Sequence, residues 1–290
     1  MSEPCILAVD AGGTSLKAML VRPEGGPVPG SFLQVPVDSQ GAAREIAGAY
    51  RALARAARDA SGEAGLSVAE VKVCIPGPFD YAAGISRMRH KYQSVYGAPM
   101  RPWFQEALGP VPVSFLHDST AFLLGAATEE DLRRHQRICG VILGTGLGFA
   151  SMYNGRMNLT PQGGPGISVF ARPYRDGSAE DYASRRAVEN AYARLRPGRP
   201  VPTVREIAGL AAAEDPGAAR CFEELGRCLG EILRNILEEE GFTLLLLGGA
   251  ISKSAGLFLP ALSGSLKGLA VEARPAEDID LAPLLGAARA

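Results

Sequence analysis

The sequence predicts an α/β protein of two lobes, and three observations support that prediction. Short apolar runs alternate with helical patterns along the 290 residues, as expected where strands and helices form layers. An apolar strand followed by a glycine turn and a hairpin occurs near residue 5 and again near residue 139. Hydrophobic residues make up 47% of the chain and charged residues 21%, which is the composition of an ordinary folded protein of this length.

The first half should contain short strands and one long helix. Apolar runs bounded by turn residues predict strands at residues 5–10, 15–22, 31–37, 71–75 and 111–116. A helix over about 40–60 is expected because Ile46, Tyr50, Leu53 and Ala57 recur at helical spacing. Between the last two strands we expect a loop at 97–103 and a short helix at 104–108.

The second half repeats this arrangement and then becomes mainly helical. A strand at 139–143 runs into glycines, and Asn154-Gly155 predicts a tight hairpin between strands at 149–153 and 156–159. An irregular stretch follows, and the later elements are expected at 180–194, 203–213, 217–240 and 281–290 for helices and 243–247 for a strand. We expect lobe one to cover 1–116 plus a C-terminal helix, 277–290, and lobe two to cover 117–276.

Net charge and cysteine content indicate which partners and which cellular location to expect. The formal net charge is −1, which gives no electrostatic reason to expect a nucleic acid or a membrane surface as partner. The five cysteines form no C-x-x-C pair and several fall in predicted strands or helices, as is typical of reduced, buried thiols. No signal-peptide pattern and no bilayer-spanning apolar run occurs in the sequence. We therefore expect a cytoplasmic protein.

The clearest chemical signal is the stretch Asp-Ala-Gly-Gly-Thr-Ser-Leu-Lys, which runs from Asp10 to Lys17. Its glycines, Gly12 and Gly13, let backbone N–H groups approach phosphate oxygens, and Asp10 ends a strand where it can hold a hydrated magnesium ion. Apolar alternation resumes at residue 18, so the turn is predicted to join a hairpin. The sequence contains no Gly-x4-Gly-Lys-Ser/Thr motif, which excludes the P-loop class.

Three more polar or glycine-rich elements follow apolar strands: His117-Asp118, Gly144-Thr-Gly-Leu-Gly148 and Gly248-Gly249. In open α/β sheets, ligands bind outside the carboxyl ends of the strands. Two glycine turns, each with a threonine, suit a triphosphate that is gripped from two sides. Asp118 stands where a general base is needed if a hydroxyl group attacks that phosphate.

In this order the motifs resemble the ROK family of bacterial sugar kinases, within the actin-like/hexokinase ATPase superfamily. The first and second glycine turns are similar to the family's two phosphate motifs, and Gly248-Gly249-Ala250 to its adenosine motif. His117-Asp118-Ser-Thr-Ala121 resembles the segment whose aspartate is the catalytic base. Segments 75–78 and 179–184 resemble parts that lie near the sugar, and 281–290 resembles the usual last helix, which returns to the first lobe.

The resemblance implies a two-lobed, ribonuclease H-like fold with a nucleotide cleft between the lobes. It implies ATP-dependent phosphorylation of a sugar, at the 6-hydroxyl of a hexose or N-acylhexosamine, with Asp118 as base and Asp10 holding magnesium through water. A homodimer is also expected. The implied phosphate-binding residues are Gly12, Gly13, Thr14, Lys17, Gly144, Thr145 and Gly146. The implied adenosine-binding residues are Gly248, Gly249 and Ala250, and the implied sugar-binding residues are Gly77, His117, Asp118 and Glu180.

The chain departs from the family pattern around the sugar. Family members carry Gly-Glu-x-Gly-His, which supplies a sugar-binding glutamate and a zinc-binding histidine, where this chain reads Gly-Gly-Pro-Gly-Ile-Ser at 163–168. No cysteine lies between Cys139 and Cys221, so the thiolates that complete the family's zinc site are missing. We therefore expect no zinc. The usual asparagine before the catalytic aspartate is His117 here.

Each of these residues also has a plainer explanation. Asp10 could cap a turn, Asp118 could cap a helix at 119–127, and Glu180 could be a first-turn acid favoured by the helix dipole. The basic run 87–91, which includes His90 and Lys91, is either a solvated loop or a contact to the sugar or to a second subunit. Two other functions stay open: a non-catalytic regulator that binds sugar or nucleotide, and an actin-like ATPase with a non-sugar substrate. We expect no DNA binding, because the first strand begins at Cys5.

Overall fold

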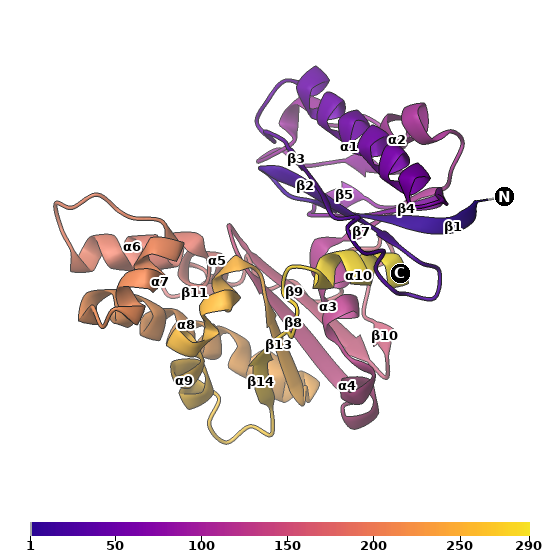
Figure 1. The fold of residues 1–290 in the computed structure, drawn as a ribbon. Coiled ribbons are helices and arrows are strands. Elements are labelled where there is room, and N and C mark those ends of the chain that lie inside the picture. Colours follow the sequence, from indigo (N-terminus) through magenta and orange to yellow (C-terminus); the bar gives the residue numbers. More distant parts are fainter. Residues whose placement is uncertain (1) are drawn as a thin grey trace. The chain divides into compact units, whose positions relative to one another are not determined.

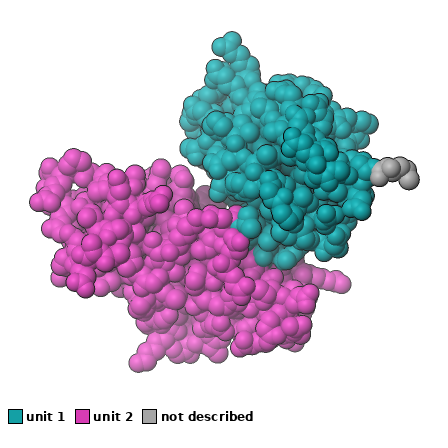
Figure 2. Space-filling view, viewed as in Figure 1, with its two compact units in different colours: residues 1–125, 159–165, 281–290 teal, residues 126–158, 166–280 magenta. Residues whose placement is uncertain are grey.

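The computed structural model describes residues 2–290, and they form two compact units (Figure 1). Unit 1 takes the chain up to Gly125, together with residues 159–165 and 281–290. Unit 2 comprises residues 126–158 and 166–280 (Figure 2). Each unit contains its own five-stranded sheet and its own hydrophobic core.

The described residues of unit 1 form seven strands and four α-helices, and one of these helices lies within residues 281–290. The strands are β1 (Glu3–Ala11), β2 (Ser15–Val21), β3 (Leu33–Pro36), β4 (Leu66–Ile75), β5 (Phe79–Asp80), β6 (Ile85–Ser86) and β7 (Val113–His117). The helices are α1 (Ala43–Glu63), α2 (Arg101–Leu108), α3 (Asp118–Ala126) and α10 (Ala282–Arg289), with a short 3-10 turn at Gln93–Val95. All but the last residue of α3 belongs to this unit.

Unit 2 contains the remaining elements. Its strands are β8 (Arg137–Leu143), β9 (Leu147–Tyr153), β10 (Arg156–Met157), β11 (Pro173–Tyr174), β12 (Gly177–Ser178), β13 (Leu244–Gly248) and β14 (Glu272–Pro275). Its helices are α4 (Glu129–Arg134), α5 (Ala179–Tyr182), α6 (Arg185–Leu195), α7 (Val204–Ala212), α8 (Pro216–Glu240) and α9 (Ala255–Ser265), with a 3-10 turn at Ala250–Ser254.

The duplication expected from the sequence is present in the strand order of the two sheets. The sheet of unit 1 runs β3-β2-β1-β4-β7, and that of unit 2 runs β10-β9-β8-β13-β14. In each sheet the first three strands are antiparallel neighbours, and the central strand then pairs in parallel with the strand beyond it. Both glycine turns therefore join the first two strands of an antiparallel hairpin, as predicted.

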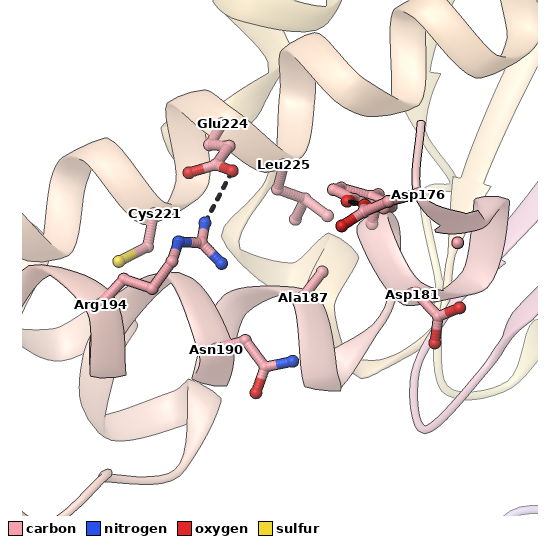
Figure 3. A pocket seen from close by; sticks show the side chains of 10 residues that line it. Asp176, Asp181, Ala187, Asn190, Arg194, Cys221, Glu224 and Leu225 are labelled. Carbon is pink, nitrogen blue, oxygen red and sulfur yellow. Dashed lines mark hydrogen bonds and ion pairs between the residues drawn. The ribbon is translucent and has the colours of Figure 1, made fainter. Parts of the chain in front are cut away.

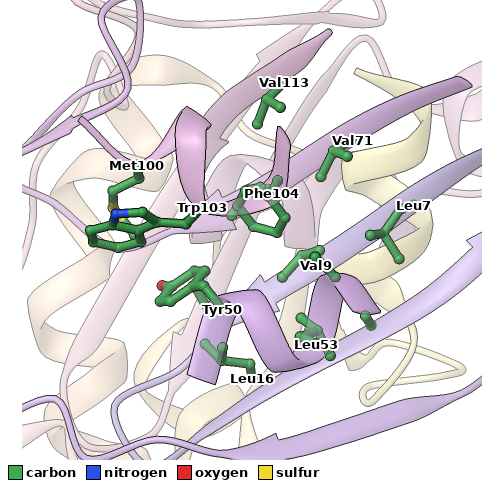
Figure 4. Close-up of a cluster of buried hydrophobic side chains, with 14 of the residues drawn as sticks. Leu7, Val9, Leu16, Tyr50, Leu53, Val71, Met100, Trp103, Phe104 and Val113 are labelled. Atoms are coloured by element: carbon green, nitrogen blue, oxygen red, sulfur yellow. The ribbon is translucent and has the colours of Figure 1, made fainter. Parts of the chain in front are cut away.

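Helices cover both faces of the sheet in unit 1. Alternate residues of β1 point to opposite faces: Leu7 and Val9 belong to the core beneath α1 and α2 (Figure 4), whereas Ala8 packs toward α10. The core on the α1 side includes the ring of Tyr50, with the ring centroid of Trp103 5.4 Å and that of Phe104 5.7 Å from it. Because helices pack on both faces of the sheet, the positions of the carboxyl ends of β1, β4 and β7 are fixed.

Helix α10 lies very close to α3, because glycines face backbone atoms where the two helices meet. A Cβ atom on Gly125 would lie 1.8 Å from the carbonyl oxygen of Ala282. A Cβ atom on Gly286 would lie 1.7 Å from the carbonyl oxygen of Ala121. Neither position has room for a side chain, so α10 packs directly against the backbone of α3, the helix that begins at Asp118.

Unit 2 is built around the long helix α8. Asp215 caps its first turn by accepting the N–H of Ala218 at 2.8 Å, Pro216 occupies its start, and Gly241 ends it in the left-handed conformation. The glycines Gly226 and Gly230 allow α9 to pack closely, because a Cβ at Gly226 would lie 2.2 Å from the carbonyl oxygen of Phe258. The buried leucines of β13 complete this core.

Two element predictions were wrong in detail. The helix expected over 180–194 is divided between α5 and α6 at Ala183–Ser184, and the break allows the N–H of Arg185 to bind the carbonyl of Gly144 at 2.8 Å. The loop expected at 97–103 ends early, because α2 begins at Arg101 with Pro102 in its first turn, where proline is well tolerated.

The expected lobe boundaries stay a prediction, but the compact units differ from them. Residues 117–125 fall in unit 1 instead of beginning the second lobe, because α3 packs against α10. Residues 277–280 fall in unit 2, and the segment 159–165 joins unit 1.

The cysteines have the environment that the sequence predicted. All five are free and buried, and burial raises the pKa values of the Cys74 and Cys139 thiols above their ordinary range. Among residues 2–290, no helix combines the length and apolar character that crossing a bilayer requires.

Candidate active site

The first glycine turn joins β1 to β2 and closes tightly on itself. Ala11 and Leu16 are paired across the hairpin, and the N–H of Gly12 donates to the carbonyl of Ser15 at 3.1 Å. A Cβ atom on Gly12 would lie 2.9 Å from that carbonyl oxygen, so only glycine fits. The turn therefore has the close-packed backbone that the Gly-Gly pair predicted.

The three carbonyl groups of this turn are all bound by the protein. The Tyr92 hydroxyl donates to the carbonyl of Gly12 at 2.5 Å. The N–H of Ser39 donates to Gly13 at 3.0 Å, and the N–H of Val37 donates to Thr14 at 3.1 Å. Within residues 2–290, the turn's own N–H groups at Gly13 and Thr14 make no such backbone hydrogen bond. Successive unpaired amides of this kind form an anion-binding nest.

Asp10 lies at the end of β1, next to the ends of β4 and β7. Asp10 is paired with Cys74 and Cys74 with Leu116, so the parallel register brings Asp10 near Asp118, which begins α3. The Cys74 thiol donates to Asp10 Oδ1 at 3.7 Å. Burial, and then the negative charge of Asp118, raise the pKa of Asp10 to about 6.

The pKa of Asp118 is shifted in the opposite direction. Its Oδ1 lies 2.9 Å from His117 Nδ1 and accepts the N–H of Ser119 at 2.7 Å. Burial alone would raise its pKa, but the charge and hydrogen bond of His117, assisted by the charge of Lys91, bring the pKa of Asp118 below its ordinary value. Two neighbouring carboxyl groups with pKa values moved apart are typical of acid–base chemistry.

Gly77 and the segment 159–165 lie beside this pair, within unit 1. A Cβ on Gly77 would lie 3.4 Å from the Tyr81 hydroxyl and 3.5 Å from the His117 ring. The Tyr81 ring packs on His117, with centroids 6.1 Å apart. Gly163, in the left-handed conformation, packs against Tyr81. The segment that departs most from the family pattern thus begins beside Tyr81, which packs on the residue before the predicted base.

The second glycine turn, in unit 2, joins β8 to β9. Gly144 donates to the carbonyl of Gly146 at 3.1 Å, and its own carbonyl accepts the N–H of Arg185 at 2.8 Å. The Gly248-Gly249 turn follows β13, which pairs with β8. A Cβ on Gly249 would lie 2.3 Å from the carbonyl oxygen of Leu143, so the two glycine segments of this unit are in contact.

The structure divides the predicted site residues between the two units. Unit 1 holds Asp10, Gly12, Gly13, Thr14, Lys17, Gly77, His117 and Asp118, and unit 2 holds Gly144, Thr145, Gly146, Glu180, Gly248, Gly249 and Ala250. Glu180, on α5, accepts the N–H of Leu147 at 3.0 Å and pairs with Arg186 at 3.6 Å. It therefore supports the second glycine turn, and its role in sugar binding stays a prediction.

An arginine–tyrosine cluster holds the β11–β12 hairpin. The Arg175 guanidinium lies 4.9 Å from the Tyr174 ring centroid and 5.4 Å from that of Tyr182. It also pairs with Glu231 of α8 at 3.1 Å. A polar cavity of about 300 Å³ adjoins the hairpin, with an Arg194–Glu224 ion pair at 2.8 Å on its wall (Figure 3). Among the described residues, none of the predicted site residues lines it.

We expect the purified protein to contain far less than one zinc ion per chain. In the described part of the chain, no three histidine, cysteine or acidic side chains cluster as metal ligands, and a structural zinc site needs about four. Elemental analysis of the protein after expression in zinc-supplemented medium measures this. A stoichiometric zinc content would show that residues 160–180 do help to bind zinc, against this expectation.

Sequence reasoning missed three residues that shape the site: Cys74, Tyr81 and Tyr92. Cys74 was findable, because the predicted strand ending at residue 75 places it beside the end of the first strand. Tyr81 and Tyr92 carried no signal, since a tyrosine in a loop has no periodic pattern around it. Lys91 was noted only as one of a basic run, yet its charge lowers the pKa values of Asp10 and Asp118.

Comparison with known proteins identifies the family. A sequence model described as the ROK family matches residues 6–288, whereas curated protein sequences gave no match. The solved ROK hexokinase from Thermus thermophilus is 26% identical, with a TM-score of 0.74 over 98% of this chain and 96% of that chain. A ROK family glucokinase from Streptomyces griseus, solved with glucose and AMPPNP, is 22% identical, with a TM-score of 0.81 over 98% of both chains.

A ROK family transcriptional regulator, a homologue of the Escherichia coli MLC protein, has the same fold. It is 18% identical, with a TM-score of 0.79 over 98% of this chain and 77% of that chain. The fold is thus the two-lobed, actin-like ATPase fold that the motifs predicted. Since the family match extends over nearly the whole sequence, the chain belongs to the ROK family.

Proposed function

We propose that this protein transfers the γ-phosphoryl group of ATP to a hydroxyl group of a sugar. Family membership and the likeness to the hexokinase and glucokinase structures support a sugar kinase. The observation that carries the proposal is the state of Asp118. His117 Nδ1 at 2.9 Å and the Ser119 N–H at 2.7 Å lower the pKa of this carboxyl group, which favours the ionised form that a base needs before it accepts a proton.

The nucleotide would be held by the two glycine turns. The unpaired N–H groups of Gly13 and Thr14 suit phosphate oxygens, and Lys17 follows on the next strand. Gly144, Thr145 and Gly146 would bind phosphate in the same way from unit 2. Gly248 and Gly249, which lie against the end of β8, and Ala250 would bind adenosine.

Asp10 suits a magnesium ion that arrives with the nucleotide. Magnesium prefers oxygen ligands and keeps several of its waters, and a single carboxylate at a strand end matches that demand. The raised pKa of Asp10, about 6, indicates a buried carboxyl group that a nearby cation would stabilise in its ionised form. When bound, the ion would neutralise charge on the phosphates.

The residues of unit 1 would position the sugar and remove the proton from its hydroxyl group. A sugar hydroxyl placed against Asp118 would lose its proton to that carboxylate as its oxygen attacks the γ-phosphorus in line, while the bond from the γ-phosphorus to the β,γ-bridging oxygen breaks and ADP leaves. His117 would keep the carboxylate oriented, and Gly77 and His117 would contact the sugar beside Tyr81. Phosphoryl transfer depends mainly on positioning and electrostatic stabilisation, so this small set of groups suffices. By family resemblance, the acceptor would be the 6-hydroxyl of a hexose or N-acylhexosamine.

We expect one sugar of a panel to stimulate ADP release strongly. The assay couples ADP production to NADH oxidation and compares hexoses and N-acylhexosamines at equal concentration, with a no-sugar reaction as the baseline. A single sugar that raises the rate many-fold identifies the acceptor. ATP turnover that is equally fast without any sugar would instead indicate an ATPase with another substrate and would contradict the proposal.

A sugar-responsive regulator is the second candidate, because one neighbour in fold is a ROK transcriptional regulator. The observation in its favour is the 163–168 segment, which lacks the family's sugar-binding glutamate. A regulator of this kind would show sugar-dependent thermal shifts with no ADP release across the whole panel. The homodimer and the cytoplasmic location expected from the sequence stay predictions.

A further inference from the structure

Tyr92 is a buried residue whose hydroxyl group reaches the first glycine turn. Its side chain is 0% exposed, and its hydroxyl donates to the carbonyl of Gly12, 80 residues earlier in the chain, at 2.5 Å. Burial raises its pKa to about 12, so the hydroxyl group keeps its proton and stays a donor. Its backbone lies in the left-handed region, with φ 55°, which is rare for an aromatic residue. Such a conformation persists only where the surroundings enforce it.

The segment that carries Tyr92 is tied to the loop before α1. The N–H of Tyr92 donates to the carbonyl of Ser39 at 2.7 Å. On either side, Gln40 Nε2 donates to the carbonyl of His90 at 2.8 Å, and Ser94 Oγ donates to the carbonyl of Gly41 at 2.7 Å. The N–H of Ser39 in turn donates to the carbonyl of Gly13. Ser39 and Tyr92 therefore each hydrogen-bond one of two successive peptide groups of the glycine turn.

These two hydrogen bonds to carbonyl groups fix the direction in which the N–H groups of the same peptides point. In a trans peptide the C=O and the following N–H lie in one plane and point in opposite directions. The Gly12 carbonyl points to Tyr92, so the N–H of Gly13 points away from it. The same holds for the next peptide, whose carbonyl is bound by Ser39 and whose N–H belongs to Thr14. Glycine has no side chain to restrain these planes, so the restraint has to come from elsewhere.

We infer that Tyr92 is a positioning residue for phosphate binding: its hydroxyl group holds the Gly12–Gly13 peptide so that the Gly13 amide faces the phosphates of the nucleotide. The inference rests on the proposed role of this turn in binding ATP. A purely structural tyrosine would stabilise the unit without changing the relative affinity for ligands with and without phosphates. A positioning tyrosine changes that ratio.

The test compares Tyr92→Phe with the wild type and with Tyr50→Phe. Phenylalanine keeps the buried ring and removes only the hydroxyl group. Tyr50 is a matched control, because it is also fully buried and its hydroxyl donates to that of Tyr92 at 3.5 Å, whereas it makes no hydrogen bond to the turn itself. Calorimetric titration measures the dissociation constants of Mg·AMPPNP and of adenosine for each protein, and thermal melting checks the fold.

We expect Tyr92→Phe to weaken Mg·AMPPNP binding several-fold, up to about tenfold, as the loss of one good hydrogen bond implies. Adenosine affinity should stay at the wild-type value, and Tyr50→Phe should change neither constant. If Tyr92→Phe proves too unstable, Gln40→Ala, at an exposed position, loosens the same segment and should weaken Mg·AMPPNP binding in the same selective way.

The outcomes separate this inference from the proposed function. A wild-type protein that binds Mg·AMPPNP no more tightly than adenosine would contradict ATP binding through the glycine turns. A wild type that does discriminate, with an unchanged ratio of the two constants in Tyr92→Phe, would overturn the positioning role alone.

Discussion

Replacing Asp118 with asparagine is expected to lower the rate of phosphoryl transfer by about 10²–10⁴-fold, the range that general bases contribute. Asparagine has the same shape and still accepts the N–H of Ser119, which lies 2.7 Å from Oδ1. It has no carboxylate to receive the proton of the attacking hydroxyl. The measurement is kcat with the sugar that stimulates ADP release most, together with the dissociation constant of Mg·AMPPNP, which should change little.

Asp80→Asn is the control for this variant. Asp80 is also in unit 1 and also accepts a backbone N–H, that of Ala83, at 2.9 Å. Its replacement removes a carboxylate of the same kind without touching His117 or Asp118, and kcat should stay at the wild-type level. Near-normal transfer by Asp118→Asn would remove Asp118 from the role of base, even if the protein proves to be a sugar kinase.

The Gly286→Ala substitution is expected to destabilise unit 1 by about 3 kcal/mol or more, the upper range for overpacking. The new methyl group would lie 1.7 Å from the carbonyl oxygen of Ala121, and neither backbone can yield unless α3 and α10 separate. Trp103 reports on this unit alone, because it is the only tryptophan of the chain and lies 7% exposed in the core of unit 1. Its fluorescence during urea denaturation gives the midpoint for each protein.

A second glycine-to-alanine change provides the contrast. Gly48 lies within α1 and a Cβ atom there would have no neighbour within 4 Å. Alanine at this position should raise stability by about 0.5–1 kcal/mol, because glycine costs more conformational entropy in a helix. A Gly286→Ala protein that unfolds at the wild-type urea concentration would show that the helices are not in the contact described here.

The parts of the site that follow from strand order were predictable from the sequence. The end of a buried strand marks Asp10 and Asp118, and parallel strands bring their carboxyl ends to one edge, so their proximity follows once β1, β4 and β7 are recognised. The two hairpins were also predictable, since apolar alternation resumes directly after each glycine turn. Strand ends and hairpin turns depend on the residues next to them, and these can be read from a single sequence.

Features that depend on tertiary contact could not be predicted. Nothing near Tyr92 indicates that its hydroxyl group binds Gly12, because the contact joins two loops 80 residues apart. The division of the helix at Ala183–Ser184 accompanies a hydrogen bond from the Arg185 N–H to the Gly144 carbonyl, which is distant in sequence. The Glu180 contact to Leu147 is of the same kind. In each case the contact depends on a residue that is distant in the sequence, and the residues next to either partner give no sign of it.

The position of α10 has a consequence for how the protein is made. This helix packs on β1, β2 and β4, and Lys72 Nζ donates to the carbonyl of Ala290 at 2.6 Å. The unit that leaves the ribosome first is therefore completed last, since it lacks one helical layer until residues 282–289 emerge. Synthesis at about 5–20 residues per second puts this delay on the order of ten seconds. Throughout that interval the apolar face of the first sheet that includes Ala8 and Leu116 lacks the cover of α10 in the nascent chain, and transiently exposed apolar surface of this kind is what chaperones protect.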